Sequence, residues 1–278
     1  LQHITYEGQL SLKTQKVKDV IERIAHQNPD LVKPTLGPKN PWAYRNKMQM
    51  PVGGTKGDIQ MGFYAMGSHD IVQGTNCPIQ DEGNNIIAQA CYQIAKEFDI
   101  EPYDEHTGKG VLRHVIGRIG QSGWMIILVT ATEHLPHQEK WVEKLTERVP
   151  QVETIVHNVN GKRTNVILGP KNSVLYGDGT ITDHIKDLRF TLSPHSFFQV
   201  NPEQTTVLYD QALAYADLKG TEIVIDAYCG TGTISLFLAY KAKHVIGIEI
   251  VEPAITNARE NAQRNGYDNT EFIVADAA

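Results

Sequence analysis

The spacing of hydrophobic residues changes along this chain and predicts segments of different architecture. Near the N-terminus, apolar residues recur at helical intervals with charged residues between them, which predicts an amphipathic helix over residues 12–26. From residue 42 to residue 192, short runs of β-branched and aromatic residues alternate with turns and two helical patterns. That order is typical of a small α+β domain with an antiparallel sheet.

Two hairpins are expected within this second segment. Residues 42–50 and 59–64 read as paired strands, with Gly53 and Gly54 as the turn between them. Residues 111–119 and 124–129 read as a second pair, joined by the Gly-Gln-Ser-Gly sequence of residues 120–123.

After residue 202 the pattern becomes a strict alternation of strands and helices. A helix over residues 205–218 precedes three strands, at residues 222–226, 244–249 and 271–274, with a helix in each interval. Such alternation is typical of a parallel, doubly wound sheet. The predicted fold class is therefore α/β, a truncated Rossmann-like domain joined to the α+β domain.

The composition is that of an ordinary globular protein, and the small number of cysteines fits a reducing compartment. The 278 residues are 41% hydrophobic and 21% charged, with a formal net charge of −6. No apolar run reaches the ~18 residues of a membrane span, and no secretion signal opens the chain. Three scattered cysteines make no disulfide framework. We expect a cytoplasmic protein with no membrane partner.

Charge is distributed unevenly and suggests where a polyanion would bind. Residues 33–66 hold five basic residues against one acidic residue, whereas residues 199–278 hold five basic against eleven acidic. The basic segment also carries Trp42, Tyr44, Phe63 and Tyr64. Cations interleaved with aromatic rings suit single-stranded RNA. A solvated face beside an ordinary β core is the alternative interpretation.

A glycine-rich turn and a distant acid predict a nucleoside-bearing cofactor. Gly230 lies between a predicted strand and a predicted helix, and Glu249 ends the next strand, where it can accept ribose hydroxyls. NAD fits this spacing too. However, Ser235 replaces the third glycine, and Asp226 would repel a pyrophosphate but attract an ammonium group. These two residues favour S-adenosylmethionine (SAM).

Two longer motifs carry a family resemblance. Residues 193–202 read SPHSFFQVNP and residues 226–233 read DAYCGTGT, and together they resemble the RNA (uracil-5-)-methyltransferase family of class I SAM-dependent enzymes. Residues 44–47 and 62–79 agree with this, and the latter favours the branch that acts on 23S ribosomal RNA. The resemblance covers essentially the whole chain.

The resemblance implies a domain organisation, and it implies that this chain is a fragment of a longer protein. Residues 1–33 would be a helix that packs on the methyltransferase domain, residues 34–185 a central RNA-binding domain, and residues 186–278 a C-terminally truncated SAM-dependent methyltransferase domain. An N-terminal barrel and the catalytic C-terminus of the family would be missing. Three iron–sulfur ligands would precede residue 1, and Cys77 matches the fourth. A four-iron–four-sulfur cluster would then belong to the full-length parent and not to this chain.

Cofactor-binding residues also follow from the resemblance, position by position. Gln199 matches the family's glutamine that lines the SAM pocket, Tyr228 the aromatic residue against the cofactor, and Glu249 the ribose acid. The other matched positions are Gly230 in the turn, Thr233 near the methionine end, and Asp276 beside the adenine.

The implied activity is SAM-dependent methylation of uridine at C5 in 23S ribosomal RNA by the parent enzyme. In the family, a cysteine thiolate adds to C6 of the uracil so that C5 can attack the methyl group. That cysteine would follow Ala278, so no catalytic residue is assigned and this chain is expected to be inactive. A transfer RNA uracil-5-methyltransferase, a non-catalytic RNA-binding module and an NAD-linked reductase are the alternatives. A monomer that binds ribosomal RNA and no DNA is expected.

Overall fold

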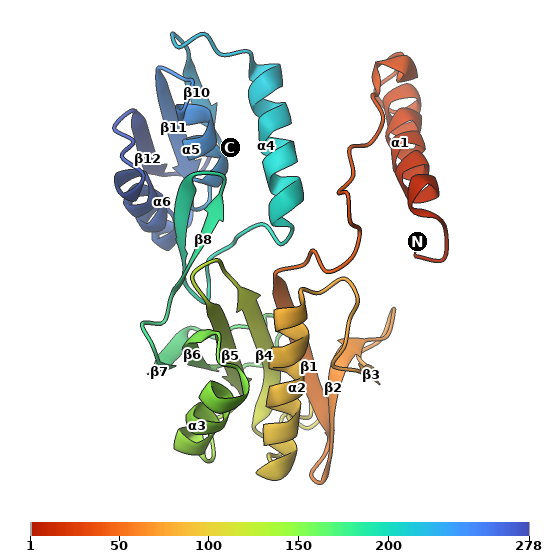
Figure 1. Ribbon diagram of the computed structural model, residues 1–278, viewed down its shortest axis with the longest axis vertical. Helices are drawn as coiled ribbons and strands as arrows, with labels where there is room; N and C mark the ends of the chain where they lie inside the picture. Colours follow the sequence, from red (N-terminus) through yellow and green to blue (C-terminus); the bar gives the residue numbers. More distant parts are fainter. Residues whose placement is uncertain (1, 278) are drawn as a thin grey trace. The chain divides into compact units, whose positions relative to one another are not determined.

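The computed structural model describes residues 2–277. They divide into two compact units, the first ending at Trp42 and the second beginning at Ala43 (Figure 1). The predicted packing of residues 1–33 on the methyltransferase domain stays a prediction. So do the predicted domain limits at residues 33 and 185.

The first unit is built on a helix that begins earlier than its apolar pattern predicts. Helix α1 spans Tyr6–Arg23, and the hydroxyl of Thr5 caps it by accepting a hydrogen bond from the Gly8 amide at 3.2 Å. The predicted start near Leu12 is wrong because this cap fixes the first turn without help from an apolar stripe. A short 3₁₀ helix, η1 (Pro29–Leu31), follows. The Tyr6 hydroxyl donates to the carbonyl of Pro38 at 2.9 Å and ties the returning chain to α1.

The second unit contains a seven-stranded sheet whose order is β3-β2-β1-β4-β5-β6-β7. Its strands are β1 (Lys47–Thr55), β2 (Asp58–Tyr64), β3 (Ile71–Gln73), β4 (Leu112–Ile119), β5 (Trp124–Thr130), β6 (Val152–Val159) and β7 (Lys171–Tyr176). Neighbouring strands are antiparallel except β5 and β6. These two are parallel because helix α3 (Gln138–Arg148) carries the chain across between them. The predicted antiparallel sheet is thus confirmed for all pairs but this one.

One of the two predicted hairpins has its turn in a different place. Gly53 and Gly54 lie inside β1 and pair with Gln60 and Ile59, so they are not the turn. The chain reverses at Gly57, whose φ of +83° is one that glycine adopts without strain. The second hairpin is confirmed, since β4 and β5 pair directly on either side of residues 120–123.

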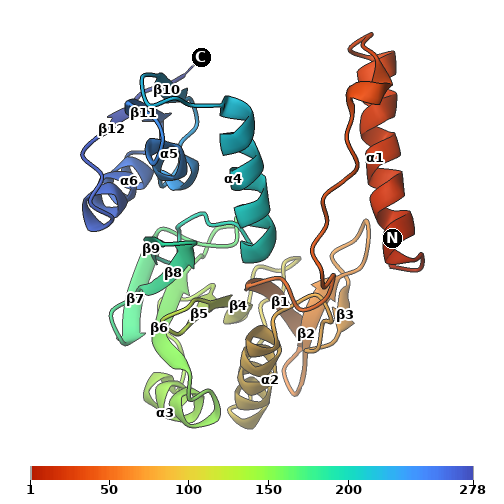
Figure 2. The ribbon, with the colours of Figure 1, turned by 45° about the horizontal axis from the view of Figure 1, so that its top comes forward.

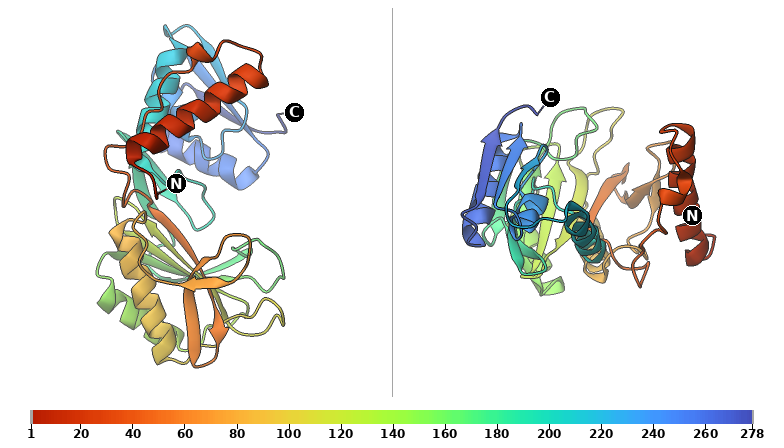
Figure 3. Two further views of the ribbon diagram at one scale, coloured as in Figure 1. Left: turned by 90° about the vertical axis from the view of Figure 1, so that its right-hand side faces the viewer. Right: turned by 90° about the horizontal axis from the view of Figure 1, so that it is seen from above.

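Hydrophobic residues are buried on both faces of the large sheet. Helix α2 (Glu82–Glu97) and α3 lie side by side on one face, as the left view of Figure 3 shows. Trp141 of α3 is fully buried there. On the other face, Ile127 of β5 belongs to the same buried cluster as Phe190 and Phe272 from the C-terminal part of the chain. The two parts of this unit therefore share one hydrophobic core.

The C-terminal part begins with a hairpin and continues as a parallel three-stranded sheet. The hairpin consists of β8 (Ile181–Ile185) and β9 (Leu188–Leu192). After α4 (Pro202–Ala216) come β10 (Ile223–Asp226), α5 (Thr233–Ala239), β11 (His244–Glu249), α6 (Glu252–Arg264) and β12 (Thr270–Val274). The strands are parallel in the order β10-β11-β12, and α5 and α6 both pack on this sheet (Figure 2). The predicted Rossmann-like alternation is confirmed.

Among the helices of residues 2–277, none combines the length and apolar character that a bilayer crossing requires.

Replacing Trp141 tests the contribution of the core beneath α3. Trp141→Ala should lower the free energy of unfolding by about 3–5 kcal/mol, the usual cost of emptying a buried tryptophan site. Its Nε1 has no hydrogen-bond partner, so packing alone is lost. Urea denaturation followed by circular dichroism measures the change. Trp42→Ala is the control, because that side chain is 45% exposed. Equal losses in both variants would contradict this account of the core.

Candidate functional site

The glycine-rich turn between β10 and α5 has a backbone that requires glycine at its end. Gly230 and Gly232 both have positive φ, +53° and +80°. The Gly232 amide donates to the carbonyl of Cys229 at 2.8 Å and closes the turn. A Cβ on Gly232 would lie 3.0 Å from the ring of Phe272. The turn is therefore pressed against β12, and a larger residue would open it.

Glu249, at the end of β11, is bound to this turn. One carboxylate oxygen, Oε2, accepts a hydrogen bond from the Gly230 amide at 3.2 Å, and Oε1 accepts from the Val251 amide at 3.0 Å. The two segments meet because β10 and β11 are parallel neighbours whose carboxyl ends lie at one edge of the sheet. A carboxylate has about four acceptor positions, so two remain for the hydroxyls of a ligand.

Glu249 and Gly230 line a cleft of about 910 Å³. Its walls come from the turn after β10, the start of α6, and the SPHSFFQVNP segment. The lining residues are Ser193, His195, Ser196, Phe197, Gly230, Thr231, Glu249, Val251, Glu252, Pro253, Ala254, Thr256 and Asn257. The cleft therefore brings together both motifs that the sequence singles out.

Gln199 and Thr233 do not line this cleft, but one tyrosine of α4 joins them. The hydroxyls of Tyr209 and Thr233 are 2.9 Å apart, and the Tyr209 hydroxyl also bonds to the Gln199 side chain. Burial raises the pKa of Tyr209, so its hydroxyl keeps its proton. Tyr209 is a residue that the sequence did not indicate, because an aromatic residue on a helix usually belongs to the core.

Tyr228 and Asp276, also predicted from the resemblance, lie outside the cleft lining. The Tyr228 side chain is 76% exposed, and Asp276 is exposed just after β12. The two adjacent phenylalanines of the SPHSFFQVNP segment have different roles. Phe197 is 72% exposed and lines the cleft, whereas Phe198 is buried against Phe190 with ring centroids 5.6 Å apart.

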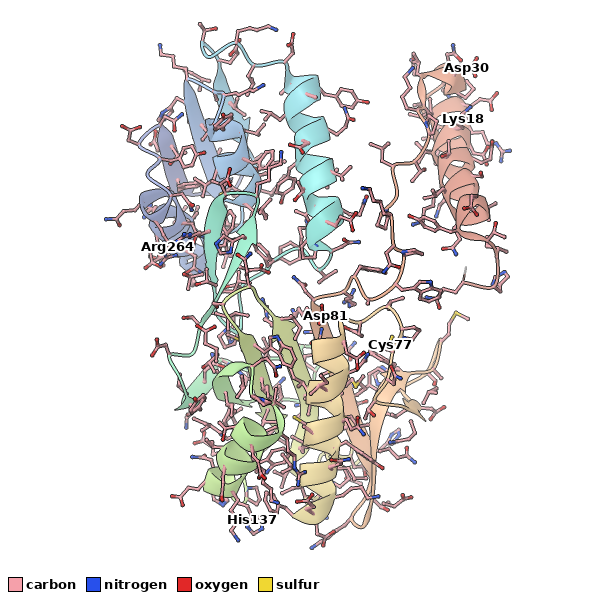
Figure 4. The ribbon with its side chains drawn as sticks, viewed as in Figure 1. Lys18, Asp30, Cys77, Asp81, His137 and Arg264 are labelled. Atoms are coloured by element: carbon pink, nitrogen blue, oxygen red, sulfur yellow. The ribbon has the colours of Figure 1, made fainter. Side chains whose placement is uncertain are left out.

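The three cysteines lie apart, and two of them are chemically quiet. Burial raises the pKa of Cys91 and raises that of Cys229 to about 12, so both are thiols at neutral pH. Cys77 is half-buried in the loop before α2, near Asp81 (Figure 4). Its amide donates to the side-chain oxygen of Asn85 at 3.0 Å.

An iron–sulfur cluster does not fit the residues that the structure describes. Within residues 2–277, no group of three or more histidine, cysteine, aspartate or glutamate side chains is placed to hold a metal ion. A four-iron cluster needs four thiolates, and Cys77 supplies one. No step of the chemistry is therefore assigned to such a cluster here.

The basic segment that precedes and begins the large sheet contains partly accessible cations and rings. Arg45 and Lys47 are half-buried at the start of β1, and the Arg45 Nε donates to the Lys47 carbonyl at 3.0 Å. Trp42 and Tyr64 are 45% and 37% exposed. The Tyr64 hydroxyl donates to Glu105 at 3.1 Å, so that ring is held in place.

Comparison with known proteins identifies the C-terminal part. Residues 218–278 match the family model of a methyltransferase domain. Over 279 aligned residues the chain is 50% identical to proteins named as uncharacterized RNA methyltransferases in Halalkalibacterium halodurans and Bacillus cereus. The alignments cover 100% of this chain and 61% of each relative. The chain thus spans about three fifths of the length of these relatives.

A solved structure resembles nearly the whole fold. The Pyrococcus abyssi tRNA (uracil-54, C5)-methyltransferase, in complex with S-adenosyl-L-homocysteine, superposes with a TM-score of 0.79 at 25% sequence identity. The match covers 99% of this chain and 64% of that protein. The chain therefore carries methyltransferase-domain sequence and is similar over its full length to RNA methyltransferases.

Proposed function

We propose that the full-length protein containing this chain transfers a methyl group from SAM to C5 of a uridine in 23S ribosomal RNA. The observation that carries the proposal is the Glu249 carboxylate, held between two backbone amides at the edge of a cleft that both sequence motifs line. The match of residues 218–278 to a methyltransferase domain supports SAM as the cofactor.

The proposed role of the chain at the cofactor is to bind and orient it. Glu249 would accept hydrogen bonds from the ribose hydroxyls, and Gly230 would let the nucleoside approach the backbone. Gln199 and Thr233, joined through Tyr209, would contact the methionine end. Tyr228 and Asp276 would flank the adenine. SAM itself supplies the methyl group.

The cysteine nucleophile that this reaction needs is not assigned to any cysteine of this chain. Cys91 and Cys229 are buried thiols with raised pKa values, and a thiol is far less nucleophilic than a thiolate. Cys77 matches a cluster ligand of the family and not its nucleophile, so we place the covalent step in the remaining length that the relatives have.

RNA would bind the basic segment of the central part. Its cations attract phosphates, and the partly exposed ring of Tyr64 suits stacking with an unpaired base. The strongly acidic C-terminal part would repel phosphates, apart from the cleft where one base must enter.

Transfer RNA is the second candidate substrate. The observation that favours it is the structural likeness to an enzyme whose name specifies tRNA uracil-54. The assignment to 23S ribosomal RNA depends instead on the motif at residues 62–79.

The methylation assay separates these substrates. Full-length protein incubated with tritiated SAM should label unmodified 23S ribosomal RNA, and digestion should yield 5-methyluridine because C5 is the proposed acceptor. Unmodified transfer RNA is offered in parallel. Label in transfer RNA alone would move the assignment to the second candidate, and label in 2′-O-methyl or cytidine products would refute C5 methylation of uridine.

Removing the Glu249 carboxylate should weaken cofactor binding. Glu249→Ala in the full-length protein should cost about 1.5–3 kcal/mol in the binding free energy of SAM, the range for a hydrogen bond to a charged group. Isothermal titration calorimetry measures it. Glu260→Ala removes an equal charge from an exposed site on α6 and should leave the affinity unchanged. An unaltered dissociation constant for Glu249→Ala would remove this residue from the site.

Removing two cations from the basic segment should weaken RNA binding without loss of cofactor affinity. Arg45→Ala with Lys47→Ala should reduce the log–log salt slope by about 1.4, since each phosphate contact to a single strand contributes roughly 0.7. Fluorescence anisotropy with a short uridine-containing RNA at several salt concentrations measures it. Lys241→Ala with Lys243→Ala is the charge-matched control in the acidic part. A wild-type slope in the first variant would mean that the RNA lies elsewhere.

A further inference from the structure

A buried arginine of the large sheet is bonded to the wall of the cofactor cleft. Arg118, near the end of β4, is 4% exposed, and its Nη2 donates to the carbonyls of Pro194 at 3.2 Å and Ser196 at 2.5 Å. Ser196 itself and its two neighbours, His195 and Phe197, line the cleft. The main chain of one cleft wall is therefore attached to a strand of the central part.

A second contact from the same part reaches the end of this segment. The amide of Asn46, just before β1, donates to the carbonyl of Val200 at 3.0 Å. Val200 follows Gln199, which we propose as a cofactor ligand. The segment from residue 194 to residue 200 is thus held at both ends by the large sheet.

Arg118 also faces other cations. Lys47 is its direct partner across the antiparallel pair β1 and β4. Like charges directly opposite each other in a sheet destabilise it. The pKa of Lys47 is lowered to about 8. Burial is the largest cause, and the positive charges of Arg118 and Arg45 add to it.

One carboxylate, that of Asp183, lies near this group of cations. Among the described residues, neither Lys47 nor Arg118 forms an ion pair. Asp183 lines a small cavity with both, but its oxygens accept hydrogen bonds from Asn46 and from the His184 amide. Neighbouring cations that form no ion pair repel each other, and an external anion that binds beside them offsets this repulsion.

We propose that Arg118 is a positioning residue for the cofactor cleft and that it couples RNA binding to cofactor affinity. The inference rests on the proposed function, in which the cleft holds SAM and the basic segment holds RNA. A phosphate bound at Lys47 relieves the repulsion on Arg118. The guanidinium then holds the carbonyls of Pro194 and Ser196 more firmly, and the cleft wall is fixed in the conformation that binds the cofactor.

The coupling works in both directions. Because linkage between two binding equilibria is reciprocal, RNA must tighten cofactor binding by the same factor by which the cofactor tightens RNA binding. Without Arg118 the two sites are no longer coupled, so RNA should change the cofactor affinity by a factor of one, which is no change.

A second arginine of the same strand provides a matched control. Arg113 of β4 is 3% exposed, and its Nη1 donates to the carbonyls of Asn160 at 2.5 Å and Lys162 at 2.7 Å. It therefore has the same burial and the same kind of bonds as Arg118, but its carbonyl partners lie outside the cleft. Arg113→Met and Arg118→Met each remove two hydrogen bonds from a buried guanidinium to main-chain carbonyls, and Arg113→Met also removes a cation that lies 4.4 Å from the centroid of the Tyr103 ring.

The experiment measures binding of S-adenosylhomocysteine to the full-length protein by calorimetry, with and without a short uridine-containing RNA. In the wild type, RNA should tighten binding about fivefold, the low end of typical coupling. Arg118→Met should weaken binding without RNA about tenfold, in the range for residues that act through others, and abolish the response to RNA. Arg113→Met should keep both the wild-type affinity and the response. Arg118→Lys retains the charge and a single donor nitrogen. Its affinity and its response to RNA should fall between those of the wild type and those of Arg118→Met.

The outcomes separate the inference from the function on which it rests. If the wild type binds no S-adenosylhomocysteine, the proposed function fails and the inference fails with it. If the wild type binds but Arg118→Met matches it in affinity and response, the inference alone is overturned. Equal weakening by Arg113→Met and Arg118→Met would also overturn it, because the effect would then be one of stability. Should Arg118→Met fail to fold, a wild-type response in Arg118→Lys overturns the coupling and a reduced response supports it.

Discussion

The hydrophobic contact between the large sheet and the β8–β9 hairpin determines how the second unit is built. Ile127 of β5 and Phe190 of β9 belong to one buried cluster, which continues into the parallel sheet through Phe272. Because this apolar face is shared, the strands that carry the basic residues and the strands that carry Glu249 form a single compact unit. The Arg118 contacts depend on it, since they join a strand of the large sheet to the segment that lines the cleft.

The fold class could be read from the sequence because local signals were strong. Alternating strands and helices after residue 202 specify a parallel sheet, and the four-residue turn at residues 120–123 specifies a hairpin. Two predicted details were wrong, the turn of the first hairpin and the start of the first helix, because strand pairing and a capping residue decide them. The turn of the first hairpin is at Gly57 and not at Gly53, because both in-strand glycines are paired with β2. Helix α1 starts at a cap that hydrophobic spacing does not record.

The candidate site was only partly readable. Glu249 and Gly230 are linked by the general geometry of parallel strands, so spacing predicts that they meet. Tyr209 contacts Thr233, 24 residues further along the chain, and Arg118 contacts Pro194, 76 residues further along, and no local pattern reports such contacts. One signal for Arg118 was present, an arginine inside a strand whose residues are nearly all buried, although that strand also holds Arg113 and His114. A charge at such a position needs partners, but the sequence does not say which.

The arrangement of β4 has a consequence for the order in which the second unit folds. β4 pairs with β5 across a tight turn, but it pairs with β1 only after the whole of α2 and its flanking loops have been bridged. Closing the long loop costs more chain entropy, so the β4–β5 hairpin can form early and the β1 pairing must follow. Until β1 arrives, the apolar edge of β4 is unpaired. The transient species most prone to aggregate during synthesis is therefore one in which the chain beyond β5 is present and β1 has not yet docked.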